Sequence, residues 1–141
     1  MSVHGSQYVD ITCVNASGDL TSSQFYFVKS TGVDTTYSAG NLTCKVCDSS
    51  TGGTGGVKGI LQNEPDTGQA AIVRVSGASK LVAGEAIAVG DLVQSGTDGR
   101  GLICDSSGSY FLARAESAST AAGQVISVRL CGPGVWMGST A

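Results

Sequence analysis

The sequence has little charge, few aromatic side chains and almost none of the residues on which enzymes rely. Lysine, arginine, aspartate and glutamate make up 13% of its 141 residues, against roughly 25% in an average soluble protein. The net charge is −3 and the basic residues are spread singly, which argues against a nucleic-acid-binding surface. No apolar run approaches the roughly 20 residues that a membrane-spanning helix needs.

Candidate catalytic residues are equally scarce. The one histidine, His4, lies in the N-terminal segment, and no Gly-x-Ser-x-Gly motif is present. We expect solvated turn carboxylates at the three glutamates, which are Glu64, Glu85 and Glu116. Asp91 and Asp98 lie beside glycines, where aspartate side chains bond to local backbone amides. We therefore predict no catalytic residue, no metal site, no bound cofactor and no enzymatic activity.

Five cysteines are present: Cys13, Cys44, Cys47, Cys104 and Cys131. Their number is odd and the N-terminal residues lack a signal-peptide pattern, so we expect reduced thiols that pack as small apolar groups. Cys44 and Cys47 have Cys-x-x-Cys spacing, but a zinc ribbon needs a second such pair. The spacing also places these two thiols on opposite faces of a strand. A redox enzyme built on this pair remains a minor alternative.

What the sequence does contain is glycine, with 21 residues, and short segments of alternating apolar and polar residues. This alternation is typical of β-strands, and turn signals recur every 8 to 12 residues. We predict strands at 7–14, 20–29, 42–47, 57–62, 71–75, 80–83, 91–94, 102–104, 110–115 and 124–130. Gly77 is expected to break a strand, and only Glu116–Ala122 has a helical pattern. The predicted fold is mainly β: a small single-domain β-barrel or β-sandwich with long loops and little or no helix.

We assign residues 1–131 to one β domain, of which 1–50 form the N-terminal part. Residues 48–56 are rich in glycine, serine and threonine, and we expect them to form a mobile loop. Gly132-Pro133-Gly134 is expected to end the last strand, so that 132–141 form a C-terminal tail. This tail carries Val135, Trp136 and Met137, which we predict to be a protein-contact arm because aromatic anchors are common at interfaces.

An ordered series of short motifs runs through residues 57–130. It comprises Gly59-Ile60-Leu61-Gln62-Asn63, Pro65, Gly68, Ala71-Ile72-Val73-Arg74-Val75-Ser76-Gly77, Ser79-Lys80, Ala83-Gly84-Glu85-Ala86-Ile87-Ala88-Val89-Gly90-Asp91, Ser95, Asp98-Gly99-Arg100, Ala113-Arg114-Ala115 and Ala122-Gly123-Gln124-Val125-Ile126-Ser127-Val128. This series resembles the small capsid decoration, or cement, proteins of tailed bacteriophages. Residues 1–50 show no corresponding resemblance.

The resemblance implies a structural protein that binds the outer surface of the major capsid protein lattice and stabilises the head. It further implies a homotrimer on the outside of the virion, made in the bacterial host cytoplasm, with no nucleic-acid or membrane partner. A weakly charged surface agrees with a protein that packs against others. The alternative is a fibre or adhesin-like module that recognises a surface glycan by aromatic stacking, with candidates Tyr8, Phe25, Tyr26, Phe27, Tyr37, Tyr110, Phe111 and Trp136.

Overall fold

The computed structural model describes residues 8–16, 18, 20–37, 39–48, 57–105 and 110–135, with 132–135 described by their backbone alone. This part of the chain contains no helix. Its nine strands are β1 (Tyr8–Val14), β2 (Phe27–Val33), β3 (Leu42–Val46), β4 (Val57–Leu61), β5 (Ala70–Val82), β6 (Leu92–Ser95), β7 (Gly101–Ile103), β8 (Tyr110–Ala115) and β9 (Val125–Val135). The predicted mainly β fold is confirmed, and the architecture is that of a barrel with additional strands.

The first five strands close into this barrel. The sheet order is β1-β3-β2-β4-β5-β9-β8-β6-β7, and β1 pairs again with β5. β1 is antiparallel to β5 along its whole length, whereas it pairs in parallel with β3 only at Val14↔Thr43. The barrel interior is filled by Cys13, Leu20, Val28, Cys44, Leu61, Ala71 and Val73. The barrel therefore has one sparsely paired junction, which we call the β1–β3 seam.

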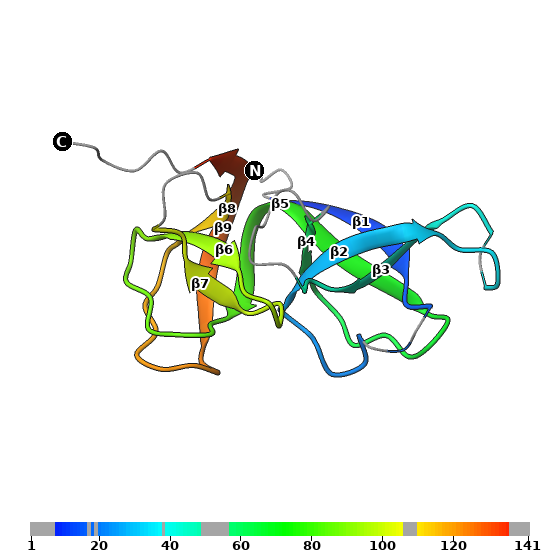
Figure 1. Cartoon of the computed structure of the whole chain (residues 1–141), viewed down its shortest axis with the longest axis horizontal. Coiled ribbons are helices and arrows are strands. Elements are labelled where there is room, and N and C mark those ends of the chain that lie inside the picture. The colour runs from blue at the N-terminus through cyan, green and yellow to red at the C-terminus, as the bar shows by residue number, and fades with distance from the viewer. Residues whose placement is uncertain are drawn as a thin grey trace, which may run out of the picture.

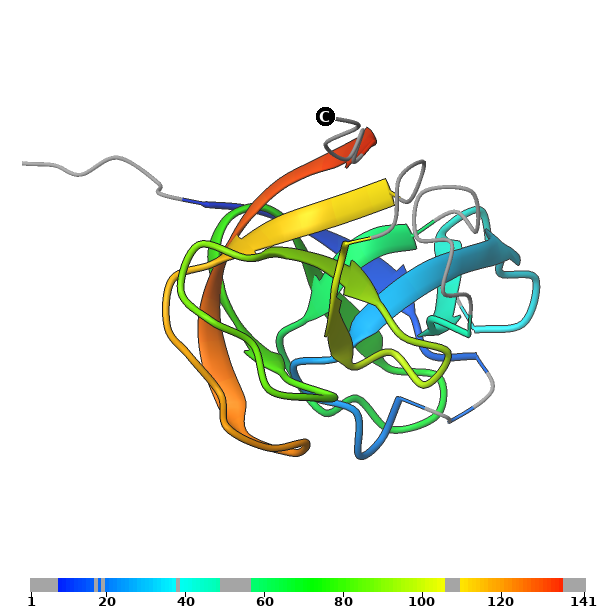
Figure 2. The same cartoon turned by 60° about the vertical axis from the view of Figure 1, so that its left-hand side comes forward.

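The second half of β5 continues into a C-terminal sheet with β9, β8, β6 and β7, so that the two halves of the molecule lie on either side of β5 (Figure 1). This sheet curls (Figure 2), and a parallel bridge between Ala83 and Gly101 brings β7 back to the end of β5. It encloses a second core, in which Phe27, Ile60, Leu81, Ile87, Val93 and Ile126 are among the buried side chains. β5 therefore contributes to both cores.

The prediction that Gly77 breaks the strand is wrong, because β5 runs unbroken from Ala70 to Val82. Gly77 pairs with Tyr8 of β1 and with Leu130 of β9, so the ladder is kept through this position. Its φ of 94° lies in the left-handed region that glycine adopts at little cost. Gly77 thus lies where β5 passes from the barrel to the C-terminal sheet.

The last strand is also longer than predicted: β9 passes through Gly132-Pro133-Gly134 and ends at Val135. Ala113 pairs with Leu130 but Phe111 pairs with Gly134, so β9 carries extra residues in a bulge. A bulge is one of the few places in a sheet where proline is tolerated, because a bulged residue need not donate a backbone hydrogen bond to the neighbouring strand.

Two other local predictions are wrong. The predicted strand at 20–29 begins only at Phe27, because Leu20 is buried and the backbone N–H groups of Ser23 and Tyr26 are taken up in turns. Glu116–Ala122 is not helical: Ser119 pairs with Ile87 across the C-terminal sheet. In both segments tertiary bonding decides the backbone conformation.

Candidate functional site

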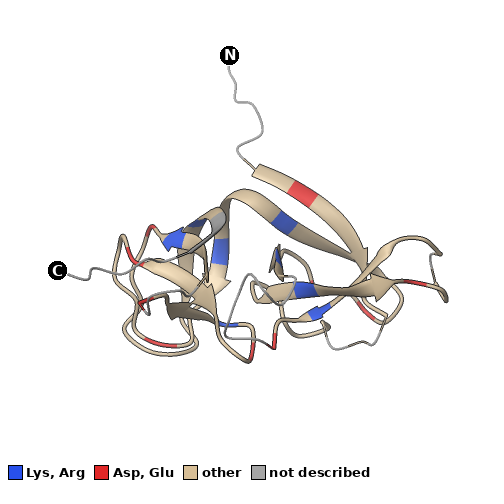
Figure 3. Ribbon diagram, turned by 45° about the horizontal axis from the view of Figure 1, so that its top comes forward, with Lys and Arg blue, Asp and Glu red and all other residues tan. Residues whose placement is uncertain are grey.

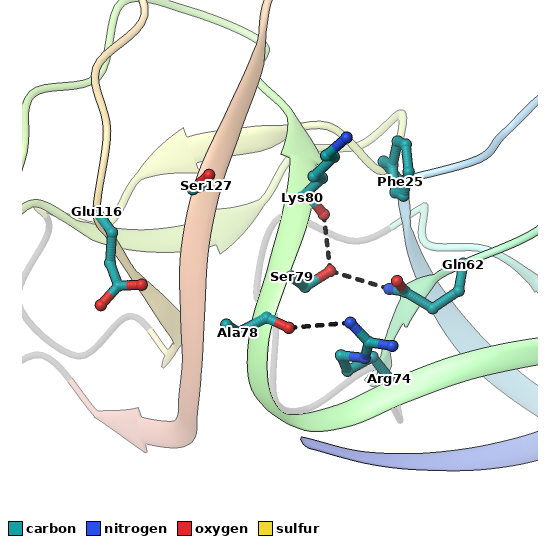
Figure 4. Close-up of a pocket in the computed structure, with 8 residues that line it drawn as sticks. All are labelled: Phe25, Gln62, Arg74, Ala78, Ser79, Lys80, Glu116 and Ser127. Atoms are coloured by element: carbon teal, nitrogen blue, oxygen red, sulfur yellow. Dashed lines mark hydrogen bonds between the residues drawn. The ribbon is translucent and has the colours of Figure 1, made fainter. Parts of the chain in front are cut away.

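A shallow groove of about 560 Å³ straddles β5 where the barrel meets the C-terminal sheet (Figure 4). Its lining residues are Phe25, Gln62, Arg74, Ala78, Ser79, Lys80, Glu116 and Ser127. In Figure 4, Glu116 and Ser127 lie on one side of β5, and Phe25, Gln62 and Arg74 lie on the other. The groove thus draws on segments far apart in the sequence that meet because both halves of the molecule share β5.

Hydrogen bonds fix the polar groups in the floor of this groove. The Gln62 Nε2 donates to Ser79 Oγ at 2.9 Å and to the Ile60 carbonyl at 3.0 Å. Ser79 Oγ donates in turn to the Lys80 carbonyl at 2.8 Å, and Arg74 donates to the Ala78 carbonyl at 3.1 Å. These bonds make the floor a rigid polar surface whose donors are largely occupied.

The groove carries one positive charge without an ion-pair partner among the described residues, that of Lys80. Its ammonium lies 5.7 Å from the centroid of the Phe25 ring, near the outer limit of a cation–π contact. The acidic lining residue, Glu116, is paired with Arg129 at 3.2 Å. Phe25 and Lys80 together offer an apolar surface beside a cation.

The predicted turn roles of Asp91 and Asp98 are confirmed. Asp91 accepts a hydrogen bond from the Ala88 N–H at 2.8 Å, and Asp98 accepts one from the Arg100 N–H at 3.1 Å. Partial burial acts to raise the pKa of Asp98, but the amide and guanidinium of Arg100 outweigh it and lower that pKa.

Glu85 differs from the prediction of a solvated turn residue, because its Oε2 accepts a hydrogen bond from the Ile103 N–H at 2.7 Å and so secures β7. Glu64 is exposed, as predicted. The other candidate, His4, lies outside the described residues. Among the residues that are described, no group of three potential metal ligands is present, and no helix is long and apolar enough to cross a membrane.

Asp48 joins two strands at the start of the predicted mobile loop. Its carboxylate contacts Lys29 of β2 at 2.6 Å and Lys45 of β3 at 2.7 Å. The hydrogen bonds from these two ammonium groups lower the pKa of Asp48 to about 2. The rest of the loop, residues 49–56, lies outside the described residues, so its mobility stays a prediction.

None of the five cysteines forms a disulfide, and four of them are buried. Cys44 points into the barrel core and Cys47 into the core of the C-terminal sheet, which confirms that the two thiols of the Cys-x-x-Cys segment face in opposite directions. Cys131 departs from the expected burial because it is exposed.

The outer face of the β1–β5 pair is the second candidate contact surface. Arg74 forms a bidentate ion pair with Asp10, in which its Nε donates to Oδ1 at 2.8 Å and its Nη2 donates to Oδ2 at 3.2 Å. The Arg74 guanidinium lies 3.7 Å from the centroid of the Tyr8 ring. Tyr8 is 46% exposed, and Ile72, which pairs with Thr12 across the two strands, is 40% exposed. We call these five residues the β1–β5 face. It combines apolar area with a charge pair that is already neutralised.

The free edge of β1 adjoins this face. From Tyr8 to Cys13 the strand is paired with β5 on one side, while its other side has no strand partner among the described residues. Such an edge presents unpaired N–H and C=O groups that can bond to another chain. Figure 3 shows the remaining charges dispersed over the ribbon rather than gathered in one patch.

The predicted contact arm is only partly described. Val135 is the last residue of β9, where its backbone pairs with Tyr110. Trp136 and Met137 lie outside the described residues, so their contact role stays a prediction. The groove and the β1–β5 face, in contrast, gave no local sequence signal, because each is assembled from residues of several strands and loops.

Comparisons with known proteins agree with this architecture. The sequence model of the family described as phage cement protein matches residues 3–130. Among solved structures, the N base of the head fiber gp8.5 of bacteriophage phi29 is similar, with 17% identity and a TM-score of 0.64 over 87% of this chain and 93% of that one. A search of the curated proteins found no match. At 17% identity, the structural likeness supports the fold alone.

Proposed function

This chain belongs to the phage cement protein family, and we propose that it binds the outer surface of the major capsid protein lattice and stabilises the phage head. The observation that carries this proposal is the family match, which extends over residues 3–130 and so includes both halves of the structure. A capsid-associated structural role follows from the family. The identity of the coat protein as partner is the proposed step.

The β1–β5 face suits such a partner. Burial of a large apolar side chain stabilises an interface by roughly 1.5–3 kcal/mol, and Tyr8 and Ile72 are both available for burial. Arg74 and Asp10 already neutralise each other, so a partner covering them need not supply a matching charge. The free edge of β1 adds backbone groups that can extend a sheet across the interface.

The groove offers a smaller, complementary contact. Lys80 is the one groove cation without an ion-pair partner among the described residues, and it lies beside Phe25. A coat-protein loop with a carboxylate next to an apolar side chain would match this arrangement.

We further propose a homotrimer that catalyses no reaction and carries no cofactor. Association is favoured by the low charge of the chain, 13% of residues, and by exposed apolar side chains in both halves, including Val33, Val89 and Val125. Synthesis would take place in the bacterial host cytoplasm, and the assembled protein would lie on the outside of the virion.

The alternative is a head- or tail-fibre or adhesin-like module that recognises a surface glycan. This chain shares its fold with the N base of a phage head fiber, which supports the alternative function. Tyr8 and Tyr37 are exposed aromatic residues that could stack on a sugar. Phe27, however, is fully buried and unavailable for stacking on a sugar.

Copy number per virion separates the two functions. Purified virions would be analysed by quantitative mass spectrometry, with isotope-labelled tryptic peptides of this chain and of the coat protein as standards. A cement protein is expected in a fixed ratio to the coat protein, in hundreds of copies. A few copies per particle would contradict the proposed cement role and favour the fibre alternative.

A further inference from the structure

Cys13 and Cys44 lie in the same buried cluster, on the two strands that meet at the β1–β3 seam. Cys13 precedes Val14 on β1 and Cys44 follows Thr43 on β3, so the two residues lie diagonally across the Val14↔Thr43 pair that joins the strands. Both side chains point into the barrel core, where they are 0% and 2% exposed. The Cys44 thiol donates a hydrogen bond to the Cys13 sulfur.

This contact makes the two thiols chemically different. The hydrogen bond from Cys44 lowers the pKa of Cys13; burial opposes this shift, and the Lys58 ammonium supports it. The same bond and burial raise the pKa of Cys44, whose proton is held between the two sulfurs. Since the thiolate is the reactive form of cysteine, Cys13 is the first of the pair to react with an oxidant.

The seam also provides a way for a small oxidant to reach them. β1 and β3 are joined by the single pair Val14↔Thr43, whereas β1 and β5 pair from end to end. Local opening occurs first where few backbone bonds hold an element. Separation of β1 from β3 would expose both sulfurs without disturbing the β1–β5 ladder.

We propose that Cys13 and Cys44 form an intramolecular disulfide that covalently closes the β1–β3 seam when the protein meets a peroxide. The Cys13 thiolate attacks one peroxide oxygen, the O–O bond breaks and hydroxide leaves, giving a sulfenic acid. The Cys44 sulfur then attacks the Cys13 sulfur, the S–S bond forms, and the hydroxyl departs as water with the Cys44 proton. In total two thiols lose two electrons and two protons, and one hydrogen peroxide becomes two waters.

The other cysteines are not placed to compete for this reaction. Cys47 belongs to the core on the other side of β3. Burial raises the pKa of Cys104, and the Asp105 carboxylate adds to the effect. Cys131 is exposed and can link two molecules, so dilute protein is used in the test. The inference concerns the barrel itself and does not depend on the capsid-binding proposal.

Tryptic mapping tests the linkage directly, because cleavage after lysine and arginine separates all five cysteines. The cysteine-bearing peptides are 1–29, 30–45, 46–58, 101–114 and 130–141. Folded protein would be treated with hydrogen peroxide, alkylated in denaturant and digested without reductant. We expect a linked 1–29/30–45 species that disappears on reduction. Recovery of both peptides in alkylated form, or linkage of Cys13 to any other cysteine, would overturn the proposal.

Two matched alanine variants complete the test. Cys47→Ala removes a buried thiol close to Cys44 in sequence and should retain the linked species, whereas Cys44→Ala should lose it. Oxidation should raise the midpoint of thermal unfolding by about 5–15 °C in the wild type and in Cys47→Ala, reversibly with dithiothreitol. An equal rise of the unfolding midpoint in oxidised Cys44→Ala would show that the stabilisation does not come from a Cys13–Cys44 disulfide, and would contradict the proposal.

Discussion

Asn15 shows how much a single buried polar side chain contributes to the barrel. It is fully buried; its Nδ2 donates to the Pro65 carbonyl at 2.8 Å, and its Oδ1 accepts from the Gly18 N–H at 3.0 Å. The bond to Pro65 joins the end of β1 to the turn between β4 and β5. Buried polar groups of this kind are costly to lose because their former partners remain unsatisfied.

Asn15→Ala should therefore lower the free energy of unfolding by about 2–3 kcal/mol. Asn63→Ala is the matched control, since Asn63 also makes two side-chain bonds, to Ala70 and Ile72 at 3.0 Å each, but both bonds are exposed to solvent. There we expect a loss below about 1 kcal/mol. Urea denaturation measures both values, and equal losses would contradict the role given to burial.

Asp48 gives the protein a predictable dependence on pH. Lys29 and Lys45 lower the pKa of Asp48 to about 2 from an ordinary value of 3.8. Because the folded-state pKa is the lower one, the stabilisation is present above pH 4 and is lost as the pH falls from about 4 to 2.

Asp48→Asn should thus be less stable than the wild type at pH 5, and most of the difference should be lost by pH 2. Denaturant unfolding of both proteins across this range measures it. A difference that stays constant down to pH 2 would mean that the carboxylate charge is not the cause.

At the scale of the strands, β4 and β5 approach each other so closely that one position must be glycine. A Cβ on Gly59 would lie 1.9 Å from the Arg74 carbonyl oxygen, a backbone atom that cannot move alone. Gly96 offers a matched site: its nearest contact would be the flexible Leu102 side chain at 3.2 Å.

Gly59→Ala should lower the free energy of unfolding by about 2–4 kcal/mol or prevent folding, whereas Gly96→Ala should cost less than about 1 kcal/mol. Calorimetry and circular dichroism of the two variants provide the comparison. Wild-type stability in Gly59→Ala would show that β4 and β5 are further apart than described.

The strands that sequence reasoning identified well are those with a simple alternation, such as β1, β3 and β8. The errors arose where a local signal was overruled by distant pairing. Gly77 predicts a break in the strand, yet pairing with Tyr8 and Leu130 keeps it in the ladder. Pro133 predicts the end of a strand, yet the bulge in β9 accommodates it. Neither outcome is encoded by the neighbouring residues alone.

The candidate site was less predictable than the fold. Phe25, Gln62 and Ser127 line one groove only because β5 is shared by two cores. The same holds for the contact between Cys13 and Cys44, whereas the Cys-x-x-Cys spacing drew attention to Cys47, which faces the other core. A one-dimensional pattern shows which face of a strand a residue occupies, but not which strand lies beside it.

For the whole molecule, the proposed homotrimer predicts a mass three times that of the 14.1 kDa chain. Sedimentation equilibrium at micromolar concentration measures it, with and without coat protein shells. A monomer in solution that also fails to form trimers on shells would contradict this part of the proposal.

Capsid binding itself is tested most directly by adding purified protein to heads that lack it. We expect saturable co-sedimentation in a fixed ratio to the coat protein, together with heads that withstand higher temperature. Ile72→Lys should weaken binding about tenfold, roughly 1.4 kcal/mol, because it places a charge in the β1–β5 face. Ala121→Lys adds the same charge at an exposed position in the C-terminal half, outside the surfaces proposed for contact, and should bind as the wild type does. Absence of binding by the folded wild-type protein at micromolar concentration would contradict the proposed function.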